Sequence, residues 1–353
     1  KYGLDCVLIG GGTKKIVDVF RKAVNGEPLP RIVRTENSPD GENTPLIRHP
    51  AIHGAVEISE GCGRNCQFCT PTMQRKIDVP LEKIMKEVEI TVRQGNSGIT
   101  LVTEDIFLYG NKDKSFAPNK DSVVKLVKSV AAYPGVEGIQ PSHMSLAPVV
   151  CNPQMVNAVA EVLIQHNLYF YEDKPIVTAE TGIETGSVRL MKKYMAGKML
   201  PYKPEQWPEI VSKAFGILND NDWCPLATLI VGLSDEKEED VLETLELMDD
   251  LKDYRAFYVP LFFVPLEGCL LMHKRGAELD SLTKVRWDLL IRCWEYNIRI
   301  WRDTFLRPRI HNPLLFNLVK KAIVPYGAKV AGIYYGMKHG KMMERALWKM
   351  ATA

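Results

Sequence analysis

The sequence has little net charge, no long apolar run and no disulfide-type cysteine pattern. Its 45 Lys and Arg residues nearly balance 43 Asp and Glu residues, and the formal net charge of +2 predicts no nucleic-acid partner. No uninterrupted apolar run is long enough to span a bilayer, and no signal peptide is expected. The eight cysteines lack the paired spacing of secreted domains, so we expect a cytoplasmic protein with reduced thiols.

The composition is otherwise that of an ordinary globular protein. Hydrophobic residues make up 46% and charged residues 25% of the 353 positions, which is typical of a soluble chain. This length suggests one large domain or two to three smaller ones. The first residue is Lys1 rather than Met, which leaves open whether the natural N-terminus lies upstream.

Three cysteines, Cys62, Cys66 and Cys69, form the most informative stretch. Their C-x3-C-x2-C spacing follows an apolar run that indicates a short buried strand. Thiolates hold iron–sulfur clusters, usually four at a time, so a cluster on these three would leave one iron for a non-protein ligand. The alternatives are three inert cysteines or a structural zinc site, for which Cys151 or Cys224 could supply a distant fourth ligand.

This spacing, with the aromatic Phe68 immediately before the last cysteine, resembles the signature of the radical SAM superfamily. The resemblance implies a 4Fe–4S cluster on Cys62, Cys66 and Cys69, with S-adenosylmethionine (SAM) on the open iron. In that family, reductive cleavage of SAM yields a 5′-deoxyadenosyl radical that abstracts hydrogen from an unactivated carbon. A low-potential electron donor of the ferredoxin or flavodoxin type is the implied partner.

The rest of the chain predicts an α/β fold in which strands alternate with helices, which favours a parallel sheet. The family resemblance implies that the strands form a partial (β/α)6 TIM-like barrel. Ligands bind such sheets beyond the carboxyl ends of the strands. The predicted strands are 55–59, 99–102, 136–140, 176–180, 227–231 and 257–264. The predicted domains are 1–35, the barrel 50–270 and a C-terminal helical region 271–353.

The N-terminal region predicts a strand at 4–9, a glycine turn at 10–12 and a helix from Ile16 to Val24, followed by a linker at 30–50. This order resembles the end of the Rossmann-like, cobalamin-binding domain that precedes many radical SAM domains. The Asp-x-His-x-x-Gly motif of such domains occurs nowhere in the sequence. The module is therefore either truncated or no longer binds cobalamin, which keeps cobalamin in doubt as a cofactor.

Polar residues follow the second and third predicted strands. Thr103, Glu104 and Asp105 come directly after a buried strand, where a carboxylate can bind an ammonium group. The position resembles the family segment that holds the SAM amino group, but its usual glycines are replaced, which leaves open which carboxylate acts. His143 follows the next strand and can titrate near neutrality at the same mouth. Ordinary loop positions are the alternative for all four residues.

Two further segments complete the predicted SAM site. Glu180, Gly182 and Glu184 lie in a glycine-flanked segment, E-T-G-I-E-T-G, in which the backbone can pass close to a ligand. It resembles the E-x-G-x-E-S-G segment of the cobalamin-type branch, which implies contacts to the sugar or methionine part of SAM. Ile230 and Val231 end the fifth predicted strand, whose family counterpart packs along adenine; a plain buried strand explains them equally well.

The C-terminal segment 311–353 has seven Lys or Arg residues and one acid, Glu344. Apolar residues from Leu314 to Ile323 form a stripe, with Lys320 and Lys321 beside it. Such a basic amphipathic segment indicates binding at a membrane surface. A helical cap whose basic side is solvated is the alternative.

Together these features predict a radical SAM enzyme of the cobalamin-type branch that forms a carbon–carbon bond or transfers a methyl group. The basic tail suggests a membrane lipid as substrate, as in relatives that modify archaeal isoprenoid lipids. Methylthiolation of RNA or protein is the second candidate, disfavoured because the remaining cysteines are scattered. An iron–sulfur electron carrier without enzymatic activity is the alternative of another class.

Overall fold

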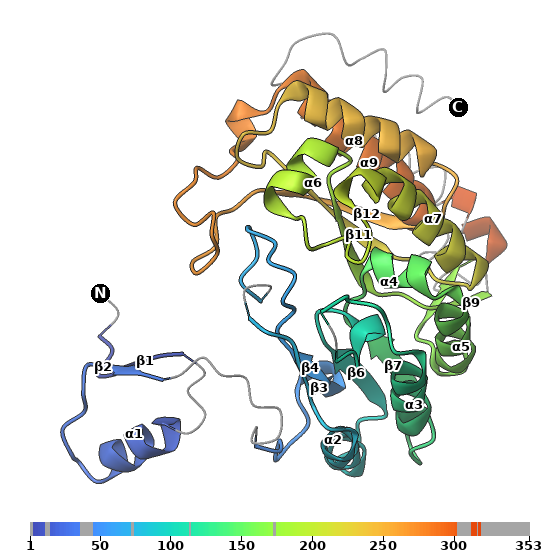
Figure 1. Ribbon diagram of the computed structural model, residues 1–353. Coiled ribbons are helices and arrows are strands. Elements are labelled where there is room, and N and C mark those ends of the chain that lie inside the picture. The colour runs from blue at the N-terminus through green and yellow to red at the C-terminus, as the bar shows by residue number, and fades with distance from the viewer. Residues whose placement is uncertain are drawn as a thin grey trace.

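The computed structural model describes residues 3–10, 15–35, 45–71, 74–112, 114–171, 174–301, 312–315 and 317–318. Figure 1 shows a small N-terminal β-α-β unit and a larger body in which helices cover parallel strands. A mixed α/β fold with parallel sheets, as predicted from the alternation of patterns, is confirmed.

The N-terminal unit pairs β1 (Val7–Ile9) in parallel with β2 (Ile32–Arg34), and α1 (Lys15–Val24) connects them. The prediction of a strand followed by a helix is confirmed, although β1 is shorter than 4–9. The prediction of an unstructured linker at 30–50 is wrong for β2, because residues 32–34 hydrogen-bond to β1. The apolar residues of α1 remain exposed, among them Phe20.

The first sheet of the body consists of β3 (Ala55–Glu57), β6 (Gly98–Val102) and β7 (Gly138–Pro141), all parallel. The strand predicted at 55–59 is divided in the structure, because β3 ends at Glu57 and Ser59 begins a separate antiparallel hairpin. This hairpin pairs β4 (Ser59–Glu60) with β5 (Ile77–Asp78). It brackets residues 61–76 and thereby fixes both ends of the cysteine segment.

The second sheet consists of β10 (Glu180–Glu184), β11 (Leu226–Val231) and β12 (Phe257–Phe262), again parallel. A parallel bridge between His143 and Glu180 links it to the end of β7. The backbone N–H of Glu180 donates to Ser142 O at 2.9 Å. The six strands therefore follow one another in the order β3-β6-β7-β10-β11-β12.

The fourth predicted strand, 176–180, is misplaced. Residues Lys174–Ile176 form β9, which pairs antiparallel with β8 (Tyr169–Tyr171), and the parallel strand begins only at Glu180. Within β10, Thr181 and Ile183 are buried whereas Glu180 and Gly182 are partly exposed. This two-residue alternation is typical of a strand, but the polar side chains on the open face conceal it in the sequence. Glu180 therefore starts its strand instead of ending it.

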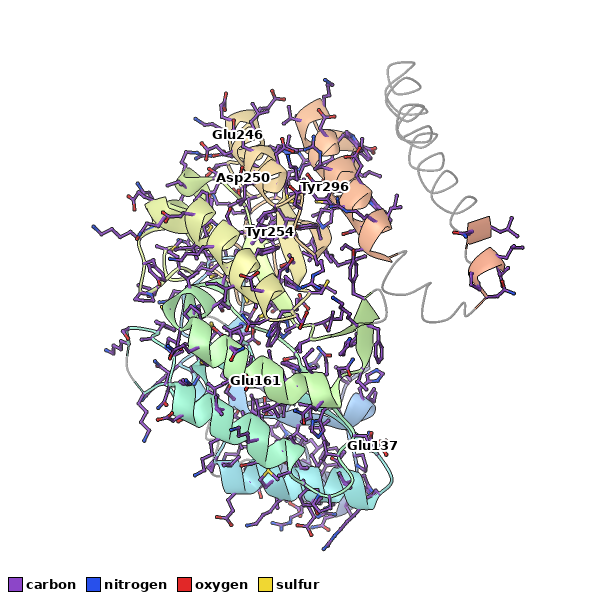
Figure 2. The ribbon with its side chains drawn as sticks, turned by 90° about the vertical axis from the view of Figure 1, so that its right-hand side faces the viewer. Glu137, Glu161, Glu246, Asp250, Tyr254 and Tyr296 are labelled. Atoms are coloured by element: carbon purple, nitrogen blue, oxygen red, sulfur yellow. The ribbon has the colours of Figure 1, made fainter. Side chains whose placement is uncertain are left out.

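Helices form the outer layer around the strands, as Figure 2 shows from the side. Their apolar faces pack on the sheets, and several acidic residues are exposed, including Glu161, Glu246 and Asp250 in Figure 2. The helices are α2 (Leu81–Arg93), α3 (Lys120–Ala131), α4 (Leu146–Cys151), α5 (Pro153–Leu163), α6 (Val188–Tyr194), α7 (Trp207–Asp220), α8 (Glu238–Asp250) and α9 (Lys284–Trp301).

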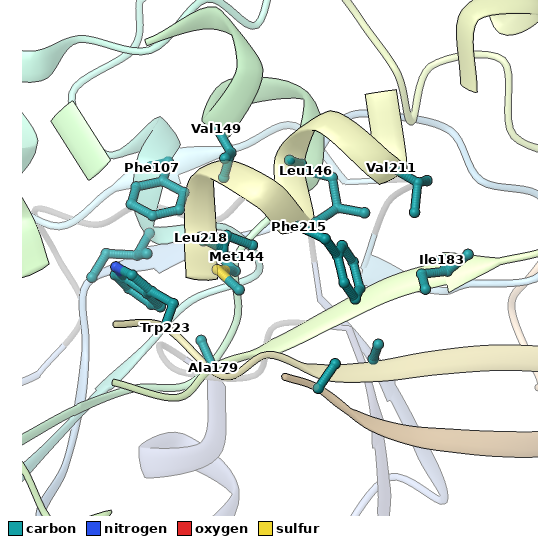
Figure 3. Packing of buried hydrophobic residues seen from close by; sticks show 14 of the residues in the cluster. Phe107, Met144, Leu146, Val149, Ala179, Ile183, Val211, Phe215, Leu218 and Trp223 are labelled. Atoms are coloured by element: carbon teal, nitrogen blue, oxygen red, sulfur yellow. The ribbon is translucent and has the colours of Figure 1, made fainter. Parts of the chain in front are cut away.

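One hydrophobic core joins the two halves of the body. The rings of Phe107 and Trp223 lie 5.6 Å apart and pack near Leu218 and Met144 (Figure 3). Aromatic residues near β12 also belong to this core, because Tyr258 and Phe263 are almost completely buried. The core supports the sheets from the helical side, so the polar strand ends are held on a rigid base.

No helix in the described part of the chain is long and apolar enough to cross a membrane. The predicted basic tail lies almost entirely outside the described residues, including Lys320 and Lys321. Within the short described pieces, Leu314, Leu315 and Leu318 are exposed. Membrane-surface binding by this segment stays a prediction.

Candidate functional site

The cysteine loop, residues 61–71, lies between β4 and β5 and is largely buried. Cys62 and Cys66 are buried and Cys69 is half-buried. The loop turns sharply because Gly61 and Gly63 adopt positive φ angles of 67° and 75°, which glycine does without strain. Close packing excludes larger residues as well: a Cβ on Gly61 would lie 2.6 Å from the backbone oxygen of Arg75.

The thiols of this loop have an electrostatic environment that suits metal coordination. Burial raises the pKa of Cys66 to about 12 and raises that of Cys62, while the cations Lys198 and Arg64 oppose these shifts. Without a metal these cysteines therefore stay protonated. Iron overcomes this cost, since a coordinating thiol is deprotonated outright, and the two nearby cations offset the negative charge of a thiolate-bound cluster.

The donor set fits a cluster better than a single ion. No three His, Cys, Asp or Glu side chains of the described residues converge as ligands of one metal ion. A closed zinc site with Cys151 or Cys224 as fourth ligand, the alternative kept open from the sequence, therefore has no geometric support. In a 4Fe–4S cluster each thiolate binds a different iron, so the three thiols need not converge on one metal ion.

Arg64, inside the cysteine loop, clamps the loop to the strand ends. Its Nη2 lies 3.1 Å from Asp105 Oδ2, and its Nη1 donates to the backbone oxygen of Lys198 at 2.6 Å. The guanidinium carbon lies 4.8 Å from the ring centre of Phe116. The side chains of Arg64 and Asp105 are only 3% and 2% exposed. Sequence reasoning missed Arg64, although an arginine between cluster cysteines is a usable signal.

This clamp leaves one polar atom of Arg64 without a hydrogen-bond partner among the described residues, and it requires a glycine at position 197. Arg64 Nε is buried and has no hydrogen-bond partner among the described residues, which fits an acceptor supplied by a bound group. Gly197 must lack a side chain, because a Cβ there would overlap the backbone oxygen of Arg64.

The predicted acids after β6 have different positions. The Asp105 carboxylate bonds to groups of the protein itself, since its Oδ1 accepts hydrogen bonds from the backbone N–H groups of Phe107 and Ser145, both at 3.2 Å. Thr103 is also buried and its hydroxyl lies 2.6 Å from that of Ser59. Glu104 instead lines a cavity of about 350 Å³ together with residues of the cysteine loop. Of the two carboxylates, only Glu104 is therefore free to face a ligand.

On β10, Glu184 forms an ion pair with Lys198 beside Gly182. The sequence reasoning predicted Gly182 and Glu184 but missed Lys198. Lys198 Nζ donates to Glu184 Oε1 at 2.7 Å, and both side chains are mostly buried. Burial acts to lower the pKa of Lys198, but the negative charge of Glu184 and the hydrogen bond to it outweigh burial, so that the pKa is raised. A Cβ on Gly182 would overlap Glu184 Oε1, so the glycine is required where the backbone passes the ion pair.

His143 and Glu180 meet at the junction of the two sheets. His143 Nε2 lies 3.4 Å from Glu180 Oε2, and each side chain is a little over two-fifths exposed. Their hydrogen bond raises the pKa of His143 and lowers that of Glu180. The pairing therefore favours the protonated form of His143 at the junction of the two sheets.

The three predicted apolar contacts lie on different surfaces. Phe68 is partly buried and packs against the main core. On β11, Val231 is completely buried, whereas Ile230 retains 9% exposure. Because successive side chains of a strand alternate between faces, Ile230 lies on the open face of the sheet and Val231 on the helical face. Ile230 is therefore the better placed of the pair to touch a ligand.

The structure thus brings together the cysteine loop, the end of β6 through Asp105, and the end of β10 through Glu184 and Lys198. Arg64 and Lys198 are the connecting residues, and both contact segments distant in sequence. This arrangement places three thiols, a buried ion pair and a cavity-facing carboxylate around one edge of the sheet.

Comparisons with known proteins find two kinds of methylthiotransferase among the relatives of this chain. No protein-family model matches the chain. The tRNA-2-methylthio-N(6)-dimethylallyladenosine synthase of Thermotoga petrophila is 25% identical over 292 residues, which are 80% of this chain and 59% of that protein. The ribosomal protein methylthiotransferase RimO of a Nitratiruptor species is 27% identical over 252 residues, 67% of this chain and 51% of that protein.

Among solved structures, the radical SAM methyltransferase TsrM of Kitasatospora setae, with cobalamin and a [4Fe-4S] cluster bound, is 12% identical with a TM-score of 0.45. The match covers 62% of this chain and 38% of TsrM. A likeness at this level carries no argument. The cysteine loop and the methylthiotransferase relatives are together consistent with a member of the radical SAM superfamily.

Proposed function

We propose that this chain generates a 5′-deoxyadenosyl radical from SAM and uses it to modify an unactivated carbon. The observation that carries the proposal is the buried three-cysteine loop, which Arg64 holds against the strand ends. A 4Fe–4S cluster on Cys62, Cys66 and Cys69 would supply the electron that cleaves SAM. An iron–sulfur electron carrier needs no such ring of charged residues around an open edge.

The surrounding residues have separate roles in this proposal. Glu104, facing the 350 Å³ cavity, accepts hydrogen bonds from the SAM amino group. Glu184, held near Cys66 by its ion pair with Lys198, contacts the sugar or methionine part of SAM. Ile230 contributes an apolar surface for adenine. The six strands in sequential order are the wall of the partial (β/α)6 barrel that the resemblance implies.

For the group that is transferred, the comparisons favour methylthio transfer to RNA or protein over the carbon–carbon bond or lipid methylation expected from the sequence. The relatives are methylthiotransferases of tRNA and of a ribosomal protein. The chain spans 59% of the first relative's length, so the substrate remains a proposal. We place methylthio transfer first.

Carbon–carbon bond formation or methylation of an apolar molecule is the second candidate, and one observation favours it. The other described cysteines, among them Cys151, Cys224 and Cys269, are widely scattered along the chain and do not share a motif. Without a second cluster, this part of the chain has no evident sulfur source. Cobalamin has no supporting motif in the sequence, and we assign it no step.

One anaerobic experiment tests the proposal. The reconstituted protein is incubated with dithionite and methyl-deuterated SAM, and 5′-deoxyadenosine is quantified. Separate reactions contain bulk tRNA, ribosomal protein or membrane lipid. Deuterium accompanied by sulfur in tRNA or protein supports methylthio transfer, whereas deuterium without sulfur in lipid supports the second candidate. Absence of 5′-deoxyadenosine from every reaction contradicts the radical SAM proposal itself.

A further inference from the structure

Three segments outside the barrel strands pack directly on the cysteine loop. Segment 74–76 lies within 4 Å of the position of a Cβ on Gly63. Segment 110–118 contributes Phe116, whose ring faces Arg64. Segment 192–203 accepts hydrogen bonds from Gln67, whose Nε2 donates to the backbone oxygen of Lys193 at 2.9 Å. Whatever charge these segments carry is therefore placed around the cysteines.

That charge is strongly positive. The segments 74–76, 110–118 and 192–203 contain eight Lys or Arg residues and a single acid, Asp113, although the whole chain is nearly neutral. Four of these cations form ion pairs with carboxylates. The pairs are Lys76–Asp78, Lys192–Glu205, Lys193–Asp235 and Lys198–Glu184.

The other four cations of these segments, Arg75, Lys112, Lys114 and Lys203, are exposed and make no ion pair with a described residue. Within the loop itself, Asn65 between the cysteines is the exposed position. We call Arg75, Lys112 and Lys114, which surround the loop on neighbouring segments, the basic rim.

The exposed face of α8 has the opposite character. It carries Glu246 and Asp250, labelled in Figure 2, together with Glu238, Glu239, Glu243 and Asp249. An acidic partner is therefore repelled from α8 and attracted to the basic rim. Complementary surface charge directs encounter between proteins more than it sets their final affinity.

We propose that the basic rim is the docking surface for a small acidic protein that donates single electrons. The inference rests on the proposed radical function, which consumes one electron for each SAM carbon–sulfur bond cleaved. The donor is oxidised by one electron, and the bond breaks to methionine and a 5′-deoxyadenosyl radical. Because electron transfer slows steeply with distance, the donor must approach the cysteines closely, and Asn65 marks where the loop reaches solvent.

A phosphate backbone could also be attracted to a basic surface, and the tRNA-modifying relatives make RNA the rival occupant. The position of the rim favours the electron donor. Its segments contact the cysteine loop itself, and an electron donor has to approach the cysteines. A protein bound at the rim therefore lies against the point of electron entry.

The test compares a protein donor with a small reductant. In K112E/K114E, SAM cleavage driven by reduced clostridial-type ferredoxin should fall at low ionic strength, since steering changes association rates by roughly 10- to 1,000-fold. Cleavage driven by dithionite should not change, because dithionite needs no docking surface. The matched control, K213E/K252E, makes the same charge change at exposed lysines on α7 and after α8, and should leave both rates unchanged.

A second measurement does not need turnover. Oxidised ferredoxin should bind the wild-type protein in low-salt calorimetry, bind K112E/K114E at least tenfold more weakly, and lose affinity as salt is added. Equal ferredoxin binding and equal ferredoxin-driven rates in K112E/K114E would overturn the inference. So would a variant that loses only tRNA affinity, which would identify the rim as an RNA surface. If dithionite produces no 5′-deoxyadenosine with the wild type, the proposed function fails separately.

Discussion

Replacing Arg64 by methionine should destabilise the protein substantially. The substitution keeps the apolar stem but removes the guanidinium that pairs with Asp105 at 3.1 Å and donates to the backbone oxygen of Lys198 at 2.6 Å. Both charged side chains are at most 3% exposed, so the carboxylate stays buried without its partner. Breaking a buried pair in this way costs about 3–5 kcal/mol.

The loss is measured by urea unfolding of the reduced protein, followed by far-UV circular dichroism. K86M is the control, because its ion pair with Glu82 is exposed and joins neighbouring turns of α2, where such pairs contribute about 0.3–0.5 kcal/mol. The double variant R64M/D105N should recover part of the loss, since it removes the unpaired charge. A change below about 1 kcal/mol in R64M would refute the clamp.

Three other changes follow from the site. In E57Q the melting temperature should exceed that of the wild type at pH 8 and converge with it below pH 5. Burial and the charge of Glu60 raise the pKa of Glu57 from 4.5 to about 7. Ionisation of Glu57 therefore disfavours the folded wild-type protein as the pH rises. G197A should lower both stability and bound iron, because its Cβ overlaps the backbone oxygen of Arg64. E184Q should weaken SAM binding by roughly ten- to a hundredfold in calorimetry, corresponding to about 1.5–3 kcal/mol for a charge-assisted hydrogen bond, while bound iron is retained.

Each of these predictions has a control. G216A introduces a Cβ no closer than 3.5 Å to Tyr254 and should stabilise α7 by about 0.5–1 kcal/mol; equal iron loss in both glycine variants would contradict the packing argument. E161Q changes an exposed acid on α5 and should leave SAM affinity and the pH dependence of melting unchanged. Unaltered SAM affinity in E184Q would place Glu184 outside the cofactor site.

The order of the strands was predictable because buried parallel strands have apolar runs that alternate with helical patterns. The runs at 99–102 and 227–231 closely match β6 and β11. The strand β10 was misplaced by several residues because its open face carries Glu180 and Gly182, and the apolar run before it forms the end of a hairpin instead. Local periodicity does not show which segments pair with each other, and this pairing decides whether a segment joins the hairpin or the parallel sheet.

The site was predictable only where a motif carried it. The cysteines and the segment around Glu184 were found because their spacing is distinctive. Arg64 and Lys198 were not, because each acts through residues distant in sequence: Arg64 reaches residue 198, and Lys198 reaches Glu184 around α6. Likewise, only the structure shows that Asp105 is paired with Arg64 and that Glu104 faces the cavity.

The most direct test of the central claim compares the wild type with C66A after anaerobic reconstitution with iron and sulfide. Bound iron and dithionite-driven 5′-deoxyadenosine are measured on the same samples. Cys66 is buried in the centre of the loop, so its loss should abolish SAM cleavage and disrupt the cluster absorption, while the far-UV spectrum is kept. Equal iron content and equal 5′-deoxyadenosine formation in the two proteins would contradict the assignment of this loop as the cluster site.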